Sequence, residues 1–164
     1  MEVKIMQVRQ KYWHLFRPYL DGGRCSSMPF PAGKAFAICA NHLDDREDIG
    51  EGGIRSFVKY AHGFRHSPYR CYSIPDMPKK YSSGEMDFLK KNIRQLARIG
   101  TFYQWRNKGY ALDLINGTLP MLGVKYVECI TCHIDVAKVL IKAGFKNRGW
   151  NEKAQAWYYL WTSE

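Results

Sequence analysis

The pattern of apolar and polar residues predicts a chain in which strands and helices alternate. Short apolar runs favour strands over 4–8, 34–40, 94–102, 124–131 and 156–161. Apolar residues at helical spacing favour helices over 12–20, 108–118 and 135–143, and Gly144 is placed to end the last of them. Residues 54–60 fit a strand or a helix. This order predicts an α/β or α+β fold with a mixed central sheet flanked by helices, in one domain spanning 1–164.

Residues 21–33 and 44–53 are predicted to be loops, and residues 61–87 are predicted to be rich in loops. Residues 21–33 and 61–87 are rich in Gly, Ser or Pro, and 44–53 combines acidic residues with glycines. The acids of 44–53 lack the spacing of a calcium loop, so we interpret this segment as a solvated hairpin tip. Over residues 60–72, aromatic and basic side chains interleave. That pattern suits stacking on nucleic-acid bases beside phosphate contacts, and it equally suits an aromatic-walled cleft.

The chain is strongly basic, with 25 Lys and Arg against 15 Asp and Glu and a formal net charge of +10. The excess is concentrated between Ile54 and Tyr110, where twelve basic residues accompany three acids. Such a field attracts polyanions, which include nucleic acid, acidic protein and a cofactor with several phosphates. The alternative is a basic surface that only keeps the protein soluble.

Cysteine and histidine usage argues against a metal or a disulfide framework. The five cysteines have no repeated zinc spacing, so we expect reduced, buried thiols in a cytoplasmic protein. The histidines show no metal-ligand pattern, and no metal is expected. No apolar run approaches the roughly 20 residues of a membrane span, and the N-terminus lacks the layout of a signal peptide.

The segment from Gln104 to Ala111 predicts an anion site. It follows an apolar run and opens a helical pattern, with a glycine at position 109. The free N–H groups of a first helical turn point at one spot, where the helix dipole adds partial positive charge. Arg106 and Lys108 add full charges. The sequence therefore predicts that a phosphate or pyrophosphate binds at residues 106–111.

Four elements follow one another in the C-terminal half. They are a strand over 96–102, the turn Arg106-Asn-Lys-Gly109-Tyr-Ala111 with its helix, a strand over 123–128, and a short helix closing in Ala143-Gly144-Phe145. In this order and spacing they resemble the GNAT superfamily of N-acyltransferases, with its Q/R-x-x-G-x-G/A turn. The resemblance covers residues 94–161, the acyl-CoA-binding core of that family. The N-terminal Trp13-x-x-Phe16-x-x-Tyr19-Leu20 is similar to the start of some phage and microbial members.

The resemblance implies acetyl-CoA or another acyl-CoA as co-substrate. The pyrophosphate would lie on the backbone N–H groups of Arg106, Asn107, Lys108, Gly109, Tyr110 and Ala111. The pantetheine arm would pair like an extra strand with the backbone of Ile99, Gly100 and Thr101. A backbone N–H near Ile99 would polarise the thioester oxygen.

Candidate catalytic groups lie on and after the strand over 124–131. A protonated amine must lose a proton before it attacks, and Glu128 or His133 would accept it. Glu128 can equally be a structural ion-pair partner of Arg94 or Arg98. The family often places a tyrosine four residues before the closing glycine to protonate the leaving thiolate. This chain has Leu140 there, so we expect that acid to be missing or supplied from elsewhere.

These patterns favour an N-acyltransferase that transfers an acyl group directly from acyl-CoA to an amine. The basic, aromatic central region favours a nucleic-acid-linked acceptor or an acidic protein over a small cationic metabolite. Two alternatives remain open. One is a non-catalytic binding or inhibitory protein of GNAT fold, and the other is a basic nucleic-acid-binding domain.

Overall fold

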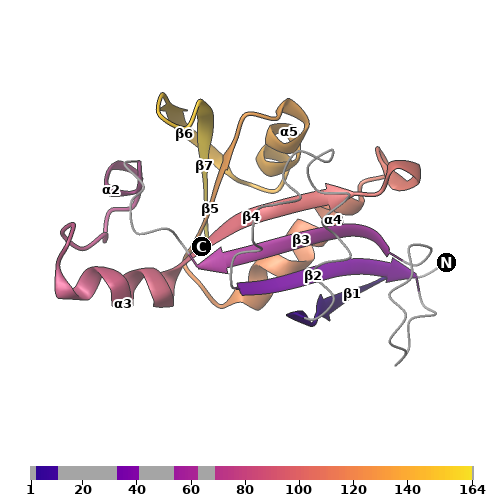
Figure 1. Ribbon diagram of the computed structural model, residues 1–164, viewed down its shortest axis with the longest axis horizontal. Helices are drawn as coiled ribbons and strands as arrows, with labels where there is room; N and C mark the ends of the chain where they lie inside the picture. Colours follow the sequence, from indigo (N-terminus) through magenta and orange to yellow (C-terminus); the bar gives the residue numbers. More distant parts are fainter. Residues whose placement is uncertain (1–2, 11–32, 41–53, 63–68, 164) are drawn as a thin grey trace. The chain divides into compact units, whose positions relative to one another are not determined.

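The computed structural model describes residues 3–10, 33–40, 54–62 and 69–163 (Figure 1). Its strands are β1 (Val3–Val8), β2 (Gly33–Ala40), β3 (Ile54–His62), β4 (Ile93–Thr101), β5 (Tyr126–Thr131), β6 (Lys146–Asn151) and β7 (Ala156–Thr162). Its helices are α2 (Arg70–Ser73), α3 (Ser83–Asn92), α4 (Tyr110–Thr118) and α5 (Ile134–Lys142), with 3-10 turns η2 (Tyr103–Trp105) and η3 (Leu119–Leu122).

The strands form a seven-stranded sheet in the order β1-β2-β3-β4-β5-β7-β6. β4 and β5 pair in parallel, whereas β1–β2, β5–β7 and β6–β7 are antiparallel. The prediction of an α+β fold with a mixed sheet and flanking helices is confirmed. The residues gather into two compact units, of which the first holds 1–60 and 97–121 and the second 61–96 and 122–164. The prediction of a single domain stays a prediction.

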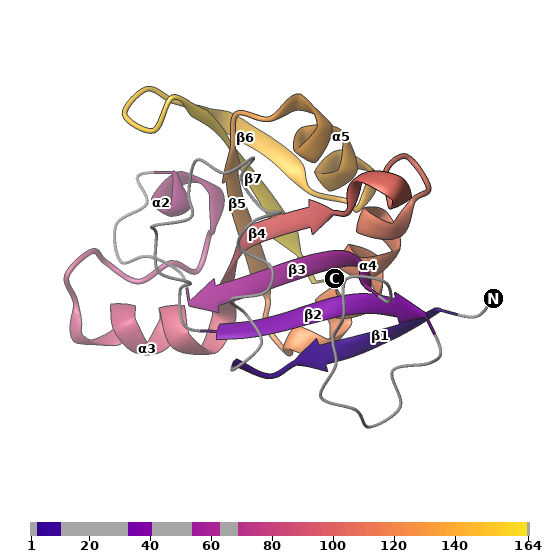
Figure 2. The same ribbon diagram turned by 45° about the vertical axis from the view of Figure 1, so that its right-hand side comes forward.

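The first unit is built on β1, β2 and β3, which lie side by side in Figure 2. The β1–β2 ladder runs from the pair Val3↔Ala40 to the pair Val8↔Ala35. Alternate residues of β2 share an apolar core with Val8, Ile54, Phe57 and Phe102, against which Trp105 packs. α4 contacts β1 and β2, and its Thr118 shares a 2.8 Å hydrogen bond with the Tyr60 hydroxyl. These contacts pack α4 against the strands, and the Tyr60 hydrogen bond anchors its last residue.

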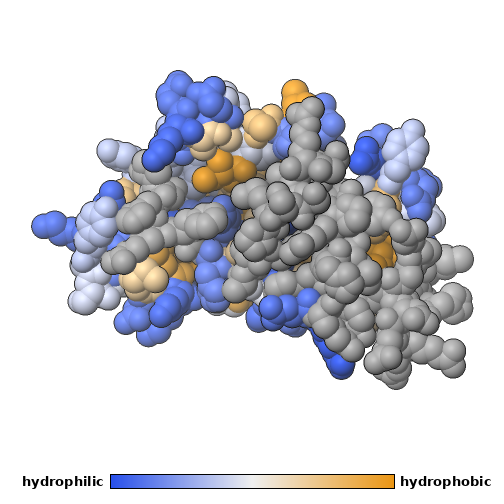
Figure 3. All heavy atoms as spheres, in the orientation of Figure 1, coloured by the Kyte–Doolittle hydropathy of each residue, from blue (hydrophilic) through white to orange (hydrophobic). Residues whose placement is uncertain are grey.

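The second unit has helices on both faces of its strands. On one face, Leu89 of α3 and Ile74 share a core with β5 and β7 residues. On the other face lies the end of α5, where a β-carbon at Gly144 would sit 3.8 Å from the Trp161 ring. Ile134 and Ile141 of α5 are exposed, and hydrophobic atoms, drawn in orange, lie over this helix in Figure 3. A β-bulge interrupts the β6–β7 ladder between Asn147 and Gly149.

The predicted elements agree with the structure apart from the points that follow. α4 begins at Tyr110, two residues later than expected, and η3 continues beyond it through Pro120. The ambiguous segment 54–60 is a strand. The segment 61–87, expected to be rich in loops, contains the end of β3, α2 and the start of α3, and β6 was not predicted. The predicted helix over 12–20 and the loop over 44–53 lie outside the described residues.

Candidate acyl-CoA site

A turn with two left-handed residues links β4 to α4, at the segment where the sequence predicts an anion site. After β4, η2 carries the chain to Arg106, whose backbone is extended. Asn107 and Gly109 then take positive φ angles of 60° and 85°. Gly109 is the N-cap of α4, and the N–H of Asp113 donates to its carbonyl over 3.0 Å. No side chain caps the α4 N-terminus among the described residues, so the first-turn N–H groups remain available to an anion.

Cationic and aromatic side chains surround this loop. The Arg55 guanidinium lies 4.4 Å from the Trp105 ring centroid and 4.9 Å from that of Tyr110, whose hydroxyl accepts a hydrogen bond from Arg55. Lys108 Nζ lies 4.8 Å from the Trp105 ring. Such cation–π contacts hold charge beside the loop. Arg55, which the sequence analysis had counted only as part of a basic region, is buried and fixes the two aromatic rings.

The loop carries charges of both signs. Arg106 is exposed, and its Nε donates to the Thr101 carbonyl over 3.3 Å, which ties the guanidinium to the end of β4. Asp113 places a carboxylate in the first turn of α4. Its Oδ2 lies 3.9 Å from the position that a β-carbon would take at Gly109. The loop therefore combines two exposed cations, Arg106 and Lys108, with one nearby acid.

The end of β4 carries the residues expected to meet the pantetheine arm. The β4–β5 ladder runs only from Ile93↔Tyr126 to Gln95↔Glu128, whereas β4 continues to Thr101. Residues 99–101 are half-buried and lie outside that ladder. The Ser56 hydroxyl donates to the Gly100 carbonyl over 2.9 Å and shares a 3.0 Å hydrogen bond with Thr101 Oγ1. β3 thus fixes the conformation of this segment from its own side.

The closing segment of α5 has the predicted geometry. Gly144 has a φ of 88°. The N–H of Phe145 donates to the Leu140 carbonyl over 3.0 Å, and that of Gly144 to Ile141 over 3.1 Å. This pair of hydrogen bonds is a Schellman motif, which needs a left-handed residue at Gly144. Leu140 is fully buried, so its side chain serves the core.

Glu128 lies in a buried ion pair on β5. Arg70 donates to both carboxylate oxygens, with Nε 3.0 Å from Oε2 and Nη2 2.5 Å from Oε1. The Tyr158 hydroxyl donates to Oε2 over 3.0 Å. Both charged side chains are 1% exposed. Burial and the adjacent Glu128 charge raise the pKa of Tyr158 well above its usual range, so this hydroxyl keeps its proton.

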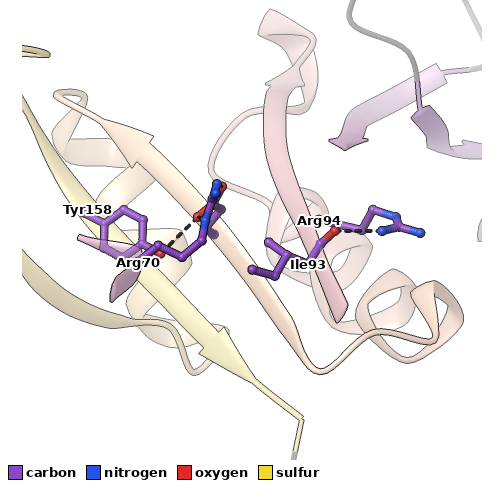
Figure 4. Close-up of polar contacts among 5 residues, drawn as sticks. Arg70, Ile93, Arg94 and Tyr158 are labelled. Carbon is purple, nitrogen blue, oxygen red and sulfur yellow. Dashed lines mark hydrogen bonds and ion pairs between the residues drawn. The ribbon is translucent and has the colours of Figure 1, made fainter. Parts of the chain in front are cut away.

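The ion-pair partner expected for Glu128 was wrong. The sequence analysis had named Arg94 or Arg98, whereas the carboxylate is held by Arg70. Arg94 donates instead to the carbonyls of Lys90 and Ile93, and Figure 4 shows it directed away from Arg70 and Tyr158. The sequence alone could not identify Arg70 as the partner of Glu128. Arg70 lies in a stretch of alternating aromatic and basic residues, a pattern typical of an exposed surface.

His133, the second catalytic candidate, lies at the exposed end of β5. It is the N-cap of α5, and its backbone N–H donates to Thr131 Oγ1 over 3.1 Å. The neighbouring Cys132 is also exposed, as is Cys71, so the expectation that the thiols are buried is wrong for these two. Cys39 and Cys129 are buried. Burial raises the pKa of the Cys39 thiol to about 11, and burial with the Glu128 charge raises that of Cys129 to about 12.

The basic region identified in the sequence is partly interior. Arg55, Lys59 and Arg70 are all buried. Burial lowers the pKa of Lys59 to about 7, so a good part of its charge is absent near neutral pH. Tyr60, one of the interleaved aromatic residues, is buried too, and residues 63–68 lie outside the described part of the chain. Fewer cations therefore face a polyanion than the composition suggests.

Two further searches concern metals and membranes. Among the described residues, no group of three or more His, Cys, Asp or Glu side chains is placed to hold a metal ion. None of the described helices is long and apolar enough to cross a membrane.

No family model matches this sequence, and no curated protein sequence matches it. Solved acetyltransferase structures share its fold. An acetyltransferase from Bacillus subtilis in complex with CoA superposes with a TM-score of 0.59 at 10% identity, covering 99% of this chain and 100% of that chain. Arabidopsis thaliana NAA60 in complex with acetyl-CoA gives 0.59 at 13% identity over the same shares. A polyamine N-acetyltransferase from Drosophila melanogaster gives 0.56 at 11% identity, covering 99% and 100%.

The likeness at these identities is one of fold. The mixed sheet flanked by helices is shared with these solved acetyltransferase structures, in line with the fold that the resemblance in the C-terminal half implied.

Proposed function

We propose that this protein is an N-acyltransferase that transfers an acyl group directly from acyl-CoA, in the first instance acetyl-CoA, to an amine. The observation that carries this proposal is the turn between β4 and α4. Gly109 adopts a left-handed conformation at the uncapped N-terminus of a nine-residue helix, with Arg106 and Lys108 exposed beside it. Structural neighbours of the same fold are bound to CoA or acetyl-CoA.

The turn suits a pyrophosphate for three reasons. The first-turn N–H groups of Tyr110 and Ala111 belong to the positive end of the helix dipole. Gly109 has no side chain to block a close approach to the backbone. Arg106, Lys108 and the flanking Asn107 add a polar rim. We assign the pyrophosphate of acyl-CoA to residues 106–111 on these grounds.

The pantetheine arm is assigned to the backbone of Ile99, Gly100 and Thr101. This segment of β4 lies beyond the last pair of the β4–β5 ladder, so an extended chain of amides can add to it as a further strand. The backbone N–H near Ile99 would then polarise the thioester carbonyl. Bound acyl-CoA supplies the activated acyl carbon, and the residues of β4 position it.

Proton transfer is assigned to the end of β5. During transfer an N–C bond replaces the C–S bond, and the proton lost by the amine must finally reach the sulfur. His133 is exposed at the end of β5, and a neutral imidazole has a ring nitrogen that can accept a proton. Glu128 is the second candidate, but its carboxylate already accepts three hydrogen bonds from Arg70 and Tyr158. This arrangement favours a positioning role for Glu128, with His133 as the base.

The chain lacks the tyrosine that the family often places four residues before the closing glycine to protonate the leaving thiolate. Leu140 occupies that place and is buried. A non-catalytic binding protein that keeps the CoA loop is therefore the second candidate function, favoured by this one residue. Under the first candidate, the thiolate takes its proton from solvent or from another side chain.

The acceptor is assigned more broadly than the sequence suggested. A nucleic-acid-linked amine or an acidic protein was favoured by the basic region, yet Arg55, Lys59 and Arg70 of that region are buried. The Drosophila melanogaster neighbour is a polyamine N-acetyltransferase, so small amines belong among the acceptors to be tested.

A cytoplasmic location stays a prediction.

Thiol release from acetyl-CoA tests this proposal. The protein is incubated with acetyl-CoA and with separate acceptors: aminoacylated tRNA, acidic protein, peptide and small amines. The proposal expects amine-dependent thiol release with at least one acceptor and strong reduction in the His133→Ala variant. Tight CoA binding without thiol release for any acceptor would instead establish the binding protein, and the absence of CoA binding would reject both.

A further inference from the structure

The buried side chain of Arg55 contacts both ends of the loop between η2 and α4. Arg55 lies on β3 and is 7% exposed. Its guanidinium carbon lies 4.4 Å from the Trp105 ring centroid and 4.9 Å from that of Tyr110, and the guanidinium donates a hydrogen bond to the Tyr110 hydroxyl. Trp105 is the last residue of η2 and Tyr110 is the first of α4. One arginine therefore holds the two residues that flank the loop.

The four residues between these contacts are exposed. Residues 106–109 face solvent, whereas Trp105 and Tyr110 are half-buried. Asn107 and Gly109 have positive φ angles of 60° and 85°, and a left-handed conformation is unfavourable for a residue that carries a side chain, as Asn107 does. Such a conformation persists where the surrounding structure holds it. The contacts of Arg55 provide that support from another strand.

The backbone of Arg55 is tied to the same region. The Phe102 N–H donates to the Arg55 carbonyl over 3.1 Å, and the Trp105 N–H donates to the Phe102 carbonyl over 2.8 Å. These two hydrogen bonds link β3 through Phe102 to η2. Arg55, Phe102, Trp105 and Tyr110 all belong to the first unit. The guanidinium therefore extends from a backbone that is itself fixed beside the loop.

A further contact extends from Trp105 to a cation of the loop. Lys108 Nζ lies 4.8 Å from the Trp105 ring centroid, and the Trp105 and Tyr110 rings lie 6.0 Å apart at an angle of 79°. Contact with an aromatic face restricts an otherwise flexible lysine side chain. Arg55 thus supports Lys108 through the Trp105 ring, and it supports the start of α4 through the Tyr110 hydroxyl. A loop that is ordered before its ligand arrives loses less conformational entropy on binding.

We propose that Arg55 is a positioning residue of the acyl-CoA site, which holds the backbone of residues 106–111 and the Lys108 ammonium in the geometry that receives the pyrophosphate. Arg55 acts through Trp105 and Tyr110 and does not itself contact the ligand. A guanidinium suits this role because it stacks on aromatic faces and also donates hydrogen bonds in a fixed plane, whereas an ammonium is a compact point charge. This inference rests on the proposed function for the identity of the ligand.

Two variants remove the contacts of Arg55 to different extents. Arg55→Met removes all the contacts of the guanidinium, whereas Tyr110→Phe removes only the hydroxyl that accepts its hydrogen bond. Calorimetry should give acetyl-CoA affinities about tenfold weaker for Arg55→Met and about threefold weaker for Tyr110→Phe. The double variant should bind no more weakly than Arg55→Met, since both changes break the same contact. Losses that add fully would overturn the inference, because the two side chains would then act independently.

A matched control and a variant that keeps the charge separate positioning from other effects. Tyr60→Phe removes a hydroxyl that shares a 2.8 Å hydrogen bond with Thr118 at the opposite end of α4, and its affinity for acetyl-CoA should equal that of the wild type. Arg55→Lys keeps the positive charge without the planar group and should lose affinity as Arg55→Met does. Wild-type affinity in Arg55→Lys would show that charge alone acts. An equal loss in Tyr60→Phe and Tyr110→Phe would show a general loosening of α4. Either result would overturn the inference.

Amide hydrogen exchange of the free protein gives a readout that does not depend on the ligand. The N–H groups of Trp105, Arg106 and Asp113 donate to backbone carbonyls on the two sides of the loop. Their exchange should be faster in Arg55→Met and Tyr110→Phe than in the wild type, and unchanged in Tyr60→Phe. Unchanged exchange in the first two variants would overturn the inference. Faster exchange in these variants, with no binding of acetyl-CoA by the wild type, would retain Arg55 as the support of the loop and reject the proposed function.

Discussion

Arg70 and Glu128 form a buried ion pair with two hydrogen bonds, although they lie 58 positions apart in the sequence. A buried carboxylate left without its cation is strongly unfavourable. Arg70→Met should therefore lower the free energy of unfolding by about 3–5 kcal/mol, measured by urea denaturation at neutral pH. The double variant Arg70→Met with Glu128→Leu should recover much of this loss, since it leaves no unpaired charge.

An exposed ion pair serves as the control for this measurement. Lys125 and Asp76 lie 3.9 Å apart and are 60% and 64% exposed. Lys125→Met should change the free energy of unfolding by no more than about 1 kcal/mol. Equal losses for Arg70→Met and Lys125→Met would show that the Arg70–Glu128 pair does not carry the stability assigned to it.

The lowered pKa of Lys59 should make the free energy of unfolding rise with pH. Burial lowers its pKa from 10.5 to about 7 in the folded protein. Between these values the unfolded chain binds more protons than the folded one, so the free energy of unfolding increases with pH. We expect an increase from pH 7 to pH 9 that is absent in Lys59→Met. A Lys59→Met variant with the same pH dependence as the wild type would contradict the lowered pKa.

The buried thiols act in the opposite sense at higher pH. The pKa of Cys39 is raised from 9.0 to about 11, and that of Cys129 from 9.0 to about 12. Above pH 9 the unfolded chain therefore loses thiol protons that the folded one keeps, and stability falls. These two effects place the maximum of stability near pH 9 and confine the Lys59 measurement to the interval below it.

Two glycines should respond to alanine in opposite directions. Gly144 has a φ of 88°, which costs a residue with a side chain about 1–2 kcal/mol. Gly84 lies in α3, and a β-carbon there would meet nothing within 4 Å. Gly84→Ala should stabilise by about 0.4–1 kcal/mol because it restricts the unfolded chain. Thermal unfolding of both variants measures the contrast, and stabilisation by Gly144→Ala would reject the Schellman ending.

Asp113 should weaken binding at the loop that it borders. Its carboxylate lies near Gly109 in the first turn of α4. Asp113→Asn removes a negative charge from the proposed pyrophosphate site, and acetyl-CoA should bind about two- to fivefold more tightly, an effect of about 0.3–1 kcal/mol. Asp135→Asn makes the same change in the first turn of α5 and should leave affinity unchanged. Calorimetry measures both, and weaker binding by Asp113→Asn would place the anion elsewhere.

The sequence predicted the parts of the fold that depend on local pattern. Apolar runs located β1, β2, β4, β5 and β7, and Gly144 marked the end of α5 because a left-handed residue is needed there. β6 was not predicted because it lacks an apolar run. Its residues Lys146, Asn147 and Arg148 are polar and exposed on an edge strand. Such a strand is fixed by pairing with β7 and not by its own apolar pattern.

In the candidate site too, features set by neighbouring residues could be predicted, whereas features set by long-range pairing could not. The anion loop depends on a short run of neighbouring residues, and its glycine turn and helix start could be predicted with an error of two residues at α4. The Arg70–Glu128 pair depends on long-range pairing of β5 with the segment around α2. No local pattern distinguishes a buried arginine from an exposed one in an aromatic, basic stretch.

The affinity for acetyl-CoA tests the central claim most directly. Calorimetric titration of the wild type should give saturable one-to-one binding. Arg106→Glu should reduce the affinity by at least tenfold, because it places a carboxylate beside the proposed pyrophosphate. Lys90→Glu makes the same change of charge at an exposed position of α3 and should bind as the wild type does. Absence of binding by the wild type, or equal affinity for Arg106→Glu, would contradict the assignment of residues 106–111 to acyl-CoA.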